Sequence, residues 1–282
     1  MKIKPTVTSD PFIIKENNPT LSSVYLAVRL PIGSIYDPEG MLGLAHYLEH
    51  VVFKSTKRFP EINGVMKYAK SLGASLNAYT TLDHTCFYII GPSNKTDELV
   101  SLLSEVVFHS TFSEEAVTTE RSIILQEYNT TLDDQWSTQL VLPLNQIRYG
   151  NTSTYNNVIG NTLTINNITY DALKETYNKF YVNGKFTILA SGNINEDSYF
   201  VDLCREHLHK GDIIPNVCPL PPLDSPRYGE NLIRHGTSED NTKLWIDFED
   251  VIVDNVRDYY IFSIINQYFG GGVSSRLWSV VR

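Results

Sequence analysis

Residues 45–53, AHYLEHVVF, form an apolar run that contains two histidines and a glutamate. The apolar residues recur at a helical spacing: Leu44, Tyr47, Leu48, Val51 and Val52. His46, Glu49 and His50 share one side of that helix, because residues three and four positions apart project the same way. Imidazoles that are buried need partners, so the fold must pack this helix and also bring polar groups to it.

Two imidazoles spaced i, i+4 can hold one zinc ion, and catalytic zinc usually takes three protein ligands and leaves one position for water. We therefore expect a third ligand for His46 and His50, a carboxylate from another element. Glu49 could take the proton from the water. The order is HxxEH, the reverse of the HExxH motif. The five residues alone leave open a helix that carries solvated His and Glu on its outer face.

Strand and helix patterns alternate along the first two thirds of the chain. Alternating and β-branched residues predict strands at 24–33, twice within 75–91, and at 185–194. Helical spacing predicts helices at 63–73, 96–110, 114–134 and 170–181, with Gly73 closing the first and Ser113 as N-cap of the third. This mixture predicts an α+β fold, a mixed or antiparallel sheet with helices packed on one face.

Prolines cluster in CPLPPLDSPRY, where the periodicity disappears, which predicts a linker at 215–228 between two domains. The first domain is then 1–214. After the linker the pattern restarts with a strand at 242–251, a helix at 254–270 and a glycine-rich turn. Because this order resembles the opening of the first domain, we expect 229–282 to be the incomplete start of a second, homologous domain.

Bulk composition excludes several classes of protein. A net charge of −9 and a pI near 5.3 argue against nucleic-acid binding. The chain has 3 scattered cysteines and no CxxC pair, which favours a reducing compartment. No signal or transit peptide and no apolar run of about 20 residues is visible. We expect a cytoplasmic protein without a membrane span, with an organellar matrix left open.

The stretch GLAHYLEHVVFKSTKRFP resembles the signature of the pitrilysin or insulinase (M16) family of zinc peptidases, and is closest in type to bacterial members similar to mitochondrial processing peptidase. In that family a glutamate 77 positions after the second histidine is the third ligand, with an acidic residue seven positions before it. Residues 127 and 120 are both Glu here. The resemblance implies one Zn²⁺ per chain on His46, His50 and Glu127, Glu49 as general base, and Glu120 orienting a ligand.

The stretch SLNAYTTLDHTCFYI resembles the family's edge strand, in which an Asn-Ala pair reaches the backbone of an extended substrate. Asn77 and Ala78 are the corresponding residues. Pairing through the main chain tolerates many side chains, so the implied substrates are unfolded or short peptides. The alternative is that Asn77 simply starts a strand.

Family members have two homologous halves that close like a clamshell. The sequence matches the first half and the opening of the second, and ends at SVVR, before the segment that carries an Arg and a Tyr in relatives. Of three explanations, we favour the first, in which the sequence is a fragment of a longer protein. In the second, a separate subunit or dimer partner supplies the second half. In the third, the protein naturally lacks the second half. The leading hypothesis is a zinc metalloendopeptidase. The alternatives are a non-catalytic or partner-dependent peptide-binding subunit and a metal-free structural domain.

Overall fold

The computed structural model describes residues 6–9, 12–133, 143, 157–194, 197–208 and 255–281. The chain divides into two compact units, Met1–Glu230 and Asn231–Arg282, which are treated one at a time. The linker expected at 215–228 and the strand expected at 242–251 lie outside the described residues.

The first unit is built on a mixed six-stranded sheet in the order β1-β2-β6-β3-β5-β4. The strands are β1 (Thr6–Ser9), β2 (Phe12–Asn17), β3 (Ser23–Leu30), β4 (Ser75–Thr80), β5 (Thr85–Pro92) and β6 (Thr187–Gly192). Neighbours are antiparallel except β2 and β6, which run parallel. β4 is an end strand, so within the described residues one of its edges has no strand partner.

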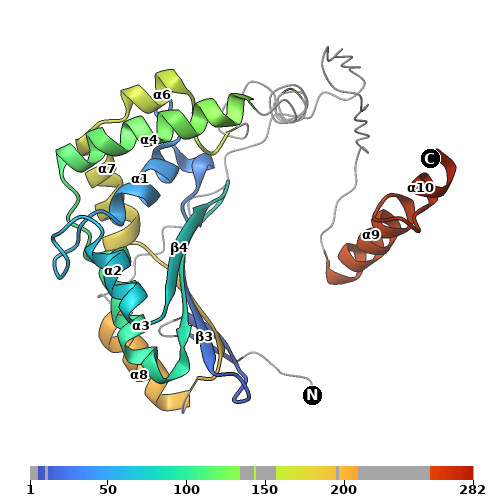
Figure 1. Ribbon diagram of the computed structural model, residues 1–282, viewed down its shortest axis with the longest axis horizontal. Coiled ribbons are helices and arrows are strands. Elements are labelled where there is room, and N and C mark those ends of the chain that lie inside the picture. Colours follow the sequence, from blue (N-terminus) through green and yellow to red (C-terminus); the bar gives the residue numbers. More distant parts are fainter. Residues whose placement is uncertain are drawn as a thin grey trace. The chain divides into compact units, whose positions relative to one another are not determined.

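Helices cover one face of this sheet, and the expected α+β class is confirmed (Figure 1). They are α1 (Leu44–Val52), α2 (Gly64–Ser71), α3 (Thr96–Phe108), α4 (Glu114–Asp133), α6 (Thr162–Asn167), α7 (Tyr170–Thr176) and α8 (Asp197–Leu208), with short turns η1 (Ser34–Tyr36), η2 (Ser93–Lys95) and η5 (Tyr177–Val182).

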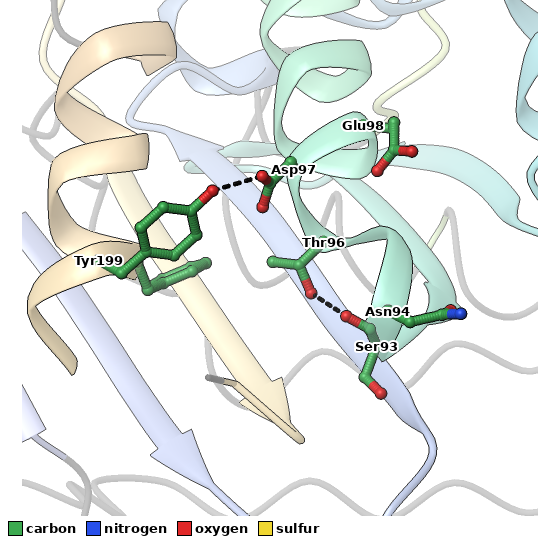
Figure 2. A pocket seen from close by; sticks show the side chains of 7 residues that line it. Ser93, Asn94, Thr96, Asp97, Glu98 and Tyr199 are labelled. Carbon is green, nitrogen blue, oxygen red and sulfur yellow. Dashed lines mark hydrogen bonds between the residues drawn. The ribbon is translucent and has the colours of Figure 1, made fainter. Parts of the chain in front are cut away.

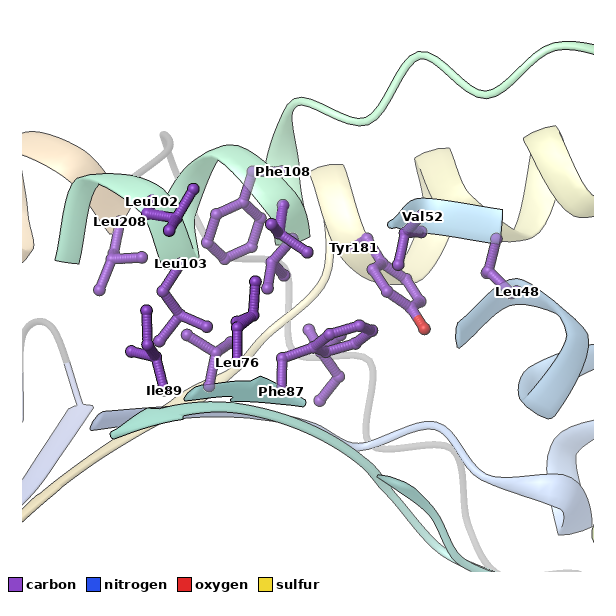
Figure 3. Close-up of a cluster of buried hydrophobic side chains, with 14 of the residues drawn as sticks. Leu48, Val52, Leu76, Phe87, Ile89, Leu102, Leu103, Phe108, Tyr181 and Leu208 are labelled. Atoms are coloured by element: carbon purple, nitrogen blue, oxygen red, sulfur yellow. The ribbon is translucent and has the colours of Figure 1, made fainter. Parts of the chain in front are cut away.

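The core lies between the sheet and these helices. Val28 of β3 pairs with Phe87 of β5, and Leu26 pairs with Ile89, so alternate residues of the two strands face the helices together. Figure 3 shows sheet residues Leu76, Phe87 and Ile89 below side chains of α3 and α1. Burial of this alternating face against α1 explains why the histidine-bearing helix holds a fixed position over β4 and β5.

Local signals predicted most helix ends correctly. The Ser113 hydroxyl accepts a hydrogen bond from Ala116 N at 3.1 Å and starts α4, and Gly73 follows α2 with φ 71°. The helix expected at 170–181 departs from the α-helical form after Thr176, where η5 continues as a π-helical turn. Tyr177 and Tyr181 of this wider turn are buried, with ring centroids 5.3 Å apart.

The second unit holds α9 (Val256–Phe269) and α10 (Arg276–Val281). The Asn255 side chain caps α9 by accepting from Asp258 N at 2.9 Å, which agrees with the helix expected at 254–270. α9 carries exposed large apolar side chains around its circumference, among them Tyr259, Ile261 and Phe262. Across the described residues, no helix combines the length and apolarity that a membrane crossing needs.

Candidate metal centre

Helix α1 presents three polar side chains on an otherwise buried surface. Its apolar residues are at most 1% exposed: Leu44, Ala45, Tyr47, Leu48, Val51 and Val52. His46 is itself 8% exposed, while Glu49 and His50 are half-buried. Burial of the apolar side thus fixes the rotation of the helix and sets the direction of the three polar residues.

The loop before α1 fixes where this helix begins. Gly43 has φ 93°, and an added Cβ would lie 2.1 Å from the carbonyl oxygen of Ile159, so only glycine fits the position. The Asp37 carboxylate accepts hydrogen bonds from Gly43 N at 2.7 Å and Ala45 N at 2.9 Å. Burial raises the pKa of Asp37 to about 7, although these backbone donors lower it. The turn directly before His46 is therefore anchored at two points.

His46, His50 and Glu127 come together between α1 and α4. His50 Nε2 lies 3.6 Å from Glu127 Oε2, and His46 Nε2 lies 3.9 Å from the same oxygen. One ligand atom from each residue lies within 4.8 Å of the other two. A tetrahedral zinc ion with N and O ligands at about 2.0–2.2 Å has ligand atoms roughly 3.3–3.5 Å apart. A contraction of this triangle, whose sides measure up to 4.8 Å, would therefore satisfy one metal ion.

Helix α4 supplies the acidic side of this cluster. Val117 and Ile124 are buried on the same helix, and the Tyr47 hydroxyl of α1 donates to the Val117 carbonyl oxygen. Glu120 and Glu127 are seven residues, or about two turns, apart and so project toward one side. The apolar contacts that dock α4 on α1 thereby bring both carboxylates to the histidines.

The Glu120 carboxylate connects His50 to a lysine. Its Oε2 lies 3.2 Å from His50 Nδ1, and its Oε1 lies 2.5 Å from Lys54 Nζ. Burial raises the pKa of Glu120, which is 2% exposed, but the hydrogen bond from His50 and the Lys54 ammonium outweigh burial and lower it. Glu120 is held as an ionised acceptor for Nδ1–H, which leaves His50 Nε2 directed at Glu127.

The pKa values of the two imidazoles are shifted in opposite directions. Burial and the neighbouring His50 lower the pKa of His46 to about 3, so His46 is neutral at ordinary pH. Burial alone would also lower the pKa of His50, but the hydrogen bond to Glu120 and the charges of Glu49 and Glu127 raise it. Among the described residues, His46 Nδ1 is buried without a hydrogen-bond partner. A cation between these side chains would balance the acidic residues that now raise the pKa of His50.

The Glu49 carboxylate is held from the sheet side. Thr80 Oγ1, at the end of β4, donates a hydrogen bond to Glu49 Oε2 at 2.7 Å. Burial raises the pKa of Glu49, the Thr80 hydroxyl and His50 lower it, and Glu127 raises it, with a raised pKa as the result. A raised pKa makes the Glu49 carboxylate, one residue from His50, a better proton acceptor than an ordinary glutamate.

The donor set fits zinc chemistry. Two imidazole nitrogens and one carboxylate oxygen are the protein ligands of a common class of catalytic zinc site, with a fourth position left for water or substrate. A second carboxylate behind one imidazole is the usual support for such a ligand. The residues His46, His50 and Glu127 could therefore hold one metal ion, with Glu49 beside it.

Asn77 and Ala78 lie on the end strand β4. Asn77 is exposed and pairs with Tyr88 of β5 through the backbone, and its side-chain Oδ1 accepts from Ala78 N at 2.9 Å. The Ala78 N–H is thus satisfied locally within the strand and not by a further strand. The structure brings these two residues to the strand that also carries Thr80, three residues beyond Asn77.

Three residues of this centre have no motif of their own in the sequence. Lys54 is four positions after His50, so helical spacing could have pointed to it as a neighbour of the ligand. Asp37 precedes a helix start, where carboxylates are favoured. Thr80 offered no signal, because its contact with Glu49 depends on how α1 packs across the sheet.

A separate hollow lies at the start of α3 (Figure 2). Its lining residues are Ser93, Asn94, Thr96, Asp97, Glu98, Tyr199 and Phe200. The Tyr199 hydroxyl donates to Asp97, and the Thr96 hydroxyl donates to the Ser93 carbonyl oxygen at 2.7 Å. None of the histidines or glutamates of the metal centre belongs to it, so it is not part of that site.

Comparison with known families gives two matches that follow each other along the chain. Residues 12–162 match the family described as insulinase (peptidase family M16). Residues 167–282 match the family described as the peptidase M16 inactive domain. All residues of the metal centre fall within the first match.

Individual relatives point the same way. The chain is 28% identical over 278 residues to the uncharacterized zinc protease YmxG of Bacillus subtilis, covering 96% of the chain and 64% of that protein. It is 30% identical over 203 residues to the human mitochondrial-processing peptidase subunit beta, covering 68% of the chain and 40% of that subunit. The chain thus spans less than two thirds of the length of these curated relatives.

The fold recurs in a solved structure of similar architecture. A protease from Helicobacter pylori superposes with a TM-score of 0.76 at 20% identity, covering 99% of this chain and 67% of that one. At this identity the likeness concerns the fold alone.

Proposed function

Because the chain belongs to the insulinase (M16) family of peptidases, we propose that it is a zinc-dependent endopeptidase of unfolded or short peptides. The observation that carries the proposal is the meeting of His46, His50 and Glu127 around one point, with Glu49 on the same helix. The names of relatives, which include zinc proteases, support the choice of metal.

In this proposal His46 Nε2, His50 Nε2 and the Glu127 carboxylate hold one Zn²⁺ per chain. Zinc at such a site polarises a peptide carbonyl and lowers the pKa of a water molecule. Glu49 would accept a proton from the attacking water on a carboxylate oxygen and return it to the departing amine nitrogen. Glu120 keeps the His50 proton on Nδ1, so that Nε2 remains a ligand.

The substrate would lie along the free edge of β4 as an added strand. The Ala78 backbone would bond the peptide main chain, and its N–H would exchange the bond to the Asn77 side chain for one to a substrate carbonyl, which would free the Asn77 amide to contact the peptide as well. Main-chain hydrogen bonds do not depend on the identity of the substrate's side chains. We therefore expect the protein to bind peptides of many sequences in extended conformation.

We also propose the domain division 1–214, 215–228 and 229–282, with the last segment opening a second homologous half. A longer polypeptide, or a partner in a homo- or heterodimer, would complete that half. Support comes from the length of the relatives, and from one relative whose name describes it as a subunit. A cytoplasmic location stays a prediction, in keeping with the free buried thiols of Cys86 and Cys204.

Metal analysis with two variants tests the proposal. His46→Ala should lose stoichiometric zinc, whereas Glu49→Gln should keep zinc and lose hydrolysis of an unfolded peptide. Zinc retained by His46→Ala would show that the ligands are wrong. Hydrolysis retained by Glu49→Gln would remove Glu49 as the base.

A peptide-binding subunit without hydrolytic activity is the second candidate. It is favoured by the description of the family matching residues 167–282 as an inactive domain. Wild-type protein that holds zinc and binds an extended peptide, yet cleaves it neither alone nor with a homologous partner, would select this second function.

A further inference from the structure

One hydroxyl group connects the candidate base to the candidate substrate strand. Thr80 Oγ1 donates to Glu49 Oε2 at 2.7 Å. Thr80 belongs to β4, whose free edge carries Asn77 and Ala78. We propose that Thr80 is a positioning residue that orients Glu49 for proton transfer and ties its orientation to the strand on which the peptide lies. This inference rests on the proposed peptidase function.

The direction of the hydrogen bonds follows from counting hydrogens. Thr85, which pairs with Thr80 across the sheet, donates its single hydroxyl hydrogen to the Ile32 carbonyl oxygen at 2.8 Å. That hydrogen is therefore not available to Thr80, whose Oγ1 lies 3.4 Å from Thr85 Oγ1. The one hydroxyl hydrogen of Thr80 goes to Glu49.

The bond leaves the two carboxylate oxygens of Glu49 unequal. Oε2 accepts the hydrogen bond from Thr80, which lowers its basicity and makes Oε1 the oxygen that more readily accepts a proton. Thr80 is β-branched, and it sits in a strand next to the fully buried Thr85, so its hydroxyl has little freedom to move. A donor fixed on a rigid strand holds the carboxylate in one rotamer better than a loop residue would.

The expected kinetic signature is a loss in turnover without a loss in binding. The Thr80 hydroxyl points at Glu49 and not at the edge groups of Asn77 and Ala78. Removing it should therefore spare KM and lower kcat. A hydrogen bond to an ionised group corresponds to about a tenfold to hundredfold change in rate.

The test compares Thr80→Val, which replaces the hydroxyl with a methyl group of similar size, with Thr80→Ser, which keeps the hydroxyl. We expect Thr80→Val to lower kcat about tenfold to hundredfold, with zinc content unchanged and KM within about twofold. Thr80→Ser should stay within about threefold of wild type. Equal impairment of both variants, or no impairment of Thr80→Val, would overturn the positioning role.

A second measurement does not depend on turnover. The zinc-loaded protein is titrated with acetohydroxamic acid, a metal-binding probe whose proton Glu49 can take. Thr80→Val should weaken binding about tenfold in the wild-type background and leave it unchanged in a Glu49→Ala background, where no carboxylate is left to orient. An equal effect in both backgrounds would contradict action through Glu49. Wild-type protein that binds neither zinc nor the probe would overturn the proposed function and this inference together.

Discussion

The two histidines of α1 lie one helical turn apart and yet have different electrostatic surroundings. His46 is almost wholly buried and its pKa falls to about 3, so it would meet a metal ion already neutral. The pKa of His50 is raised by Glu120 and two further carboxylates, which favour its protonated form. Of the two histidines, His50 is therefore the one at which protons would compete more strongly with a metal ion.

Lys54 supports the histidine pair from the far side of Glu120. It neutralises Glu120, which is 2% exposed and has His50 as its other partner. Lys54→Met should leave Glu120 under-compensated and raise the dissociation constant for zinc about tenfold, as for other groups behind metal ligands. Competition with a chromophoric chelator measures the constant.

Two variants control this experiment. Lys54→Arg keeps a cation within reach of Glu120 and should restore most of the affinity. Lys57→Met removes an exposed lysine three positions further on and should leave affinity unchanged. Zinc affinity that is the same in Lys54→Met as in wild type would show that Glu120 does not need the lysine.

The start of α1 decides where the histidines point, and Asp37 controls that start. The carboxylate accepts from Gly43 N and Ala45 N, as capping side chains do. Asp37→Ala should lower the free energy of unfolding by about 1–2 kcal/mol, while Asp37→Asn, which keeps an acceptor oxygen, should lose less. Urea unfolding of the metal-free protein checks both.

The exposed Glu39 in the same loop is the matched control, and Glu39→Ala should change stability by less than about 0.5 kcal/mol. If Asp37→Ala is as stable as Glu39→Ala, the cap does not contribute, and the position of Gly43 alone fixes the start of α1.

Elements with strong local patterns could be predicted from the sequence. The spacing of apolar residues predicted α1, α3 and α4, and alternation predicted β3, the β4–β5 pair and β6. The insertion of β6 between β2 and β3 could not be predicted, because strand order depends on which distant strands complete the buried face. The π-helical turn η5 was missed for a similar reason, since the burial of Tyr177 and Tyr181 sets its shape.

In the candidate site, too, some residues could be predicted from local sequence patterns and others could not. His46, Glu49 and His50 follow from helical spacing alone, and Glu120 and Glu127 required the resemblance to a family. Lys54 and Asp37 had only weak local signals, a helical spacing from His50 and a place before a helix start. Thr80 follows only from packing, because its partner Glu49 lies on another element.

A metal ion bound by His46, His50 and Glu127 would join α1 to α4. Zinc bound to the folded state alone should stabilise the protein by about 2.7 kcal/mol at a free concentration 100 times the dissociation constant. Thermal unfolding with zinc and with chelator measures this as a shift in Tm. Glu127→Ala should abolish most of the shift, because Glu127 is the candidate ligand on α4. An undiminished shift in that variant would place the stabilising ion elsewhere.

The parallel pairing of β2 with β6 also affects how the chain folds while it is being synthesised. Ile13 pairs with Ile188, so the partners are 188 − 13 = 175 residues apart. At about 5–20 residues per second, β2 leaves the ribosome roughly 9–35 s before its partner strand. Every residue of the metal centre is synthesised in that interval, before the sheet beneath it can close. Contacts of such long range fold slowly, and the nascent chain meanwhile exposes apolar helices and open strand edges that chaperones would have to shield.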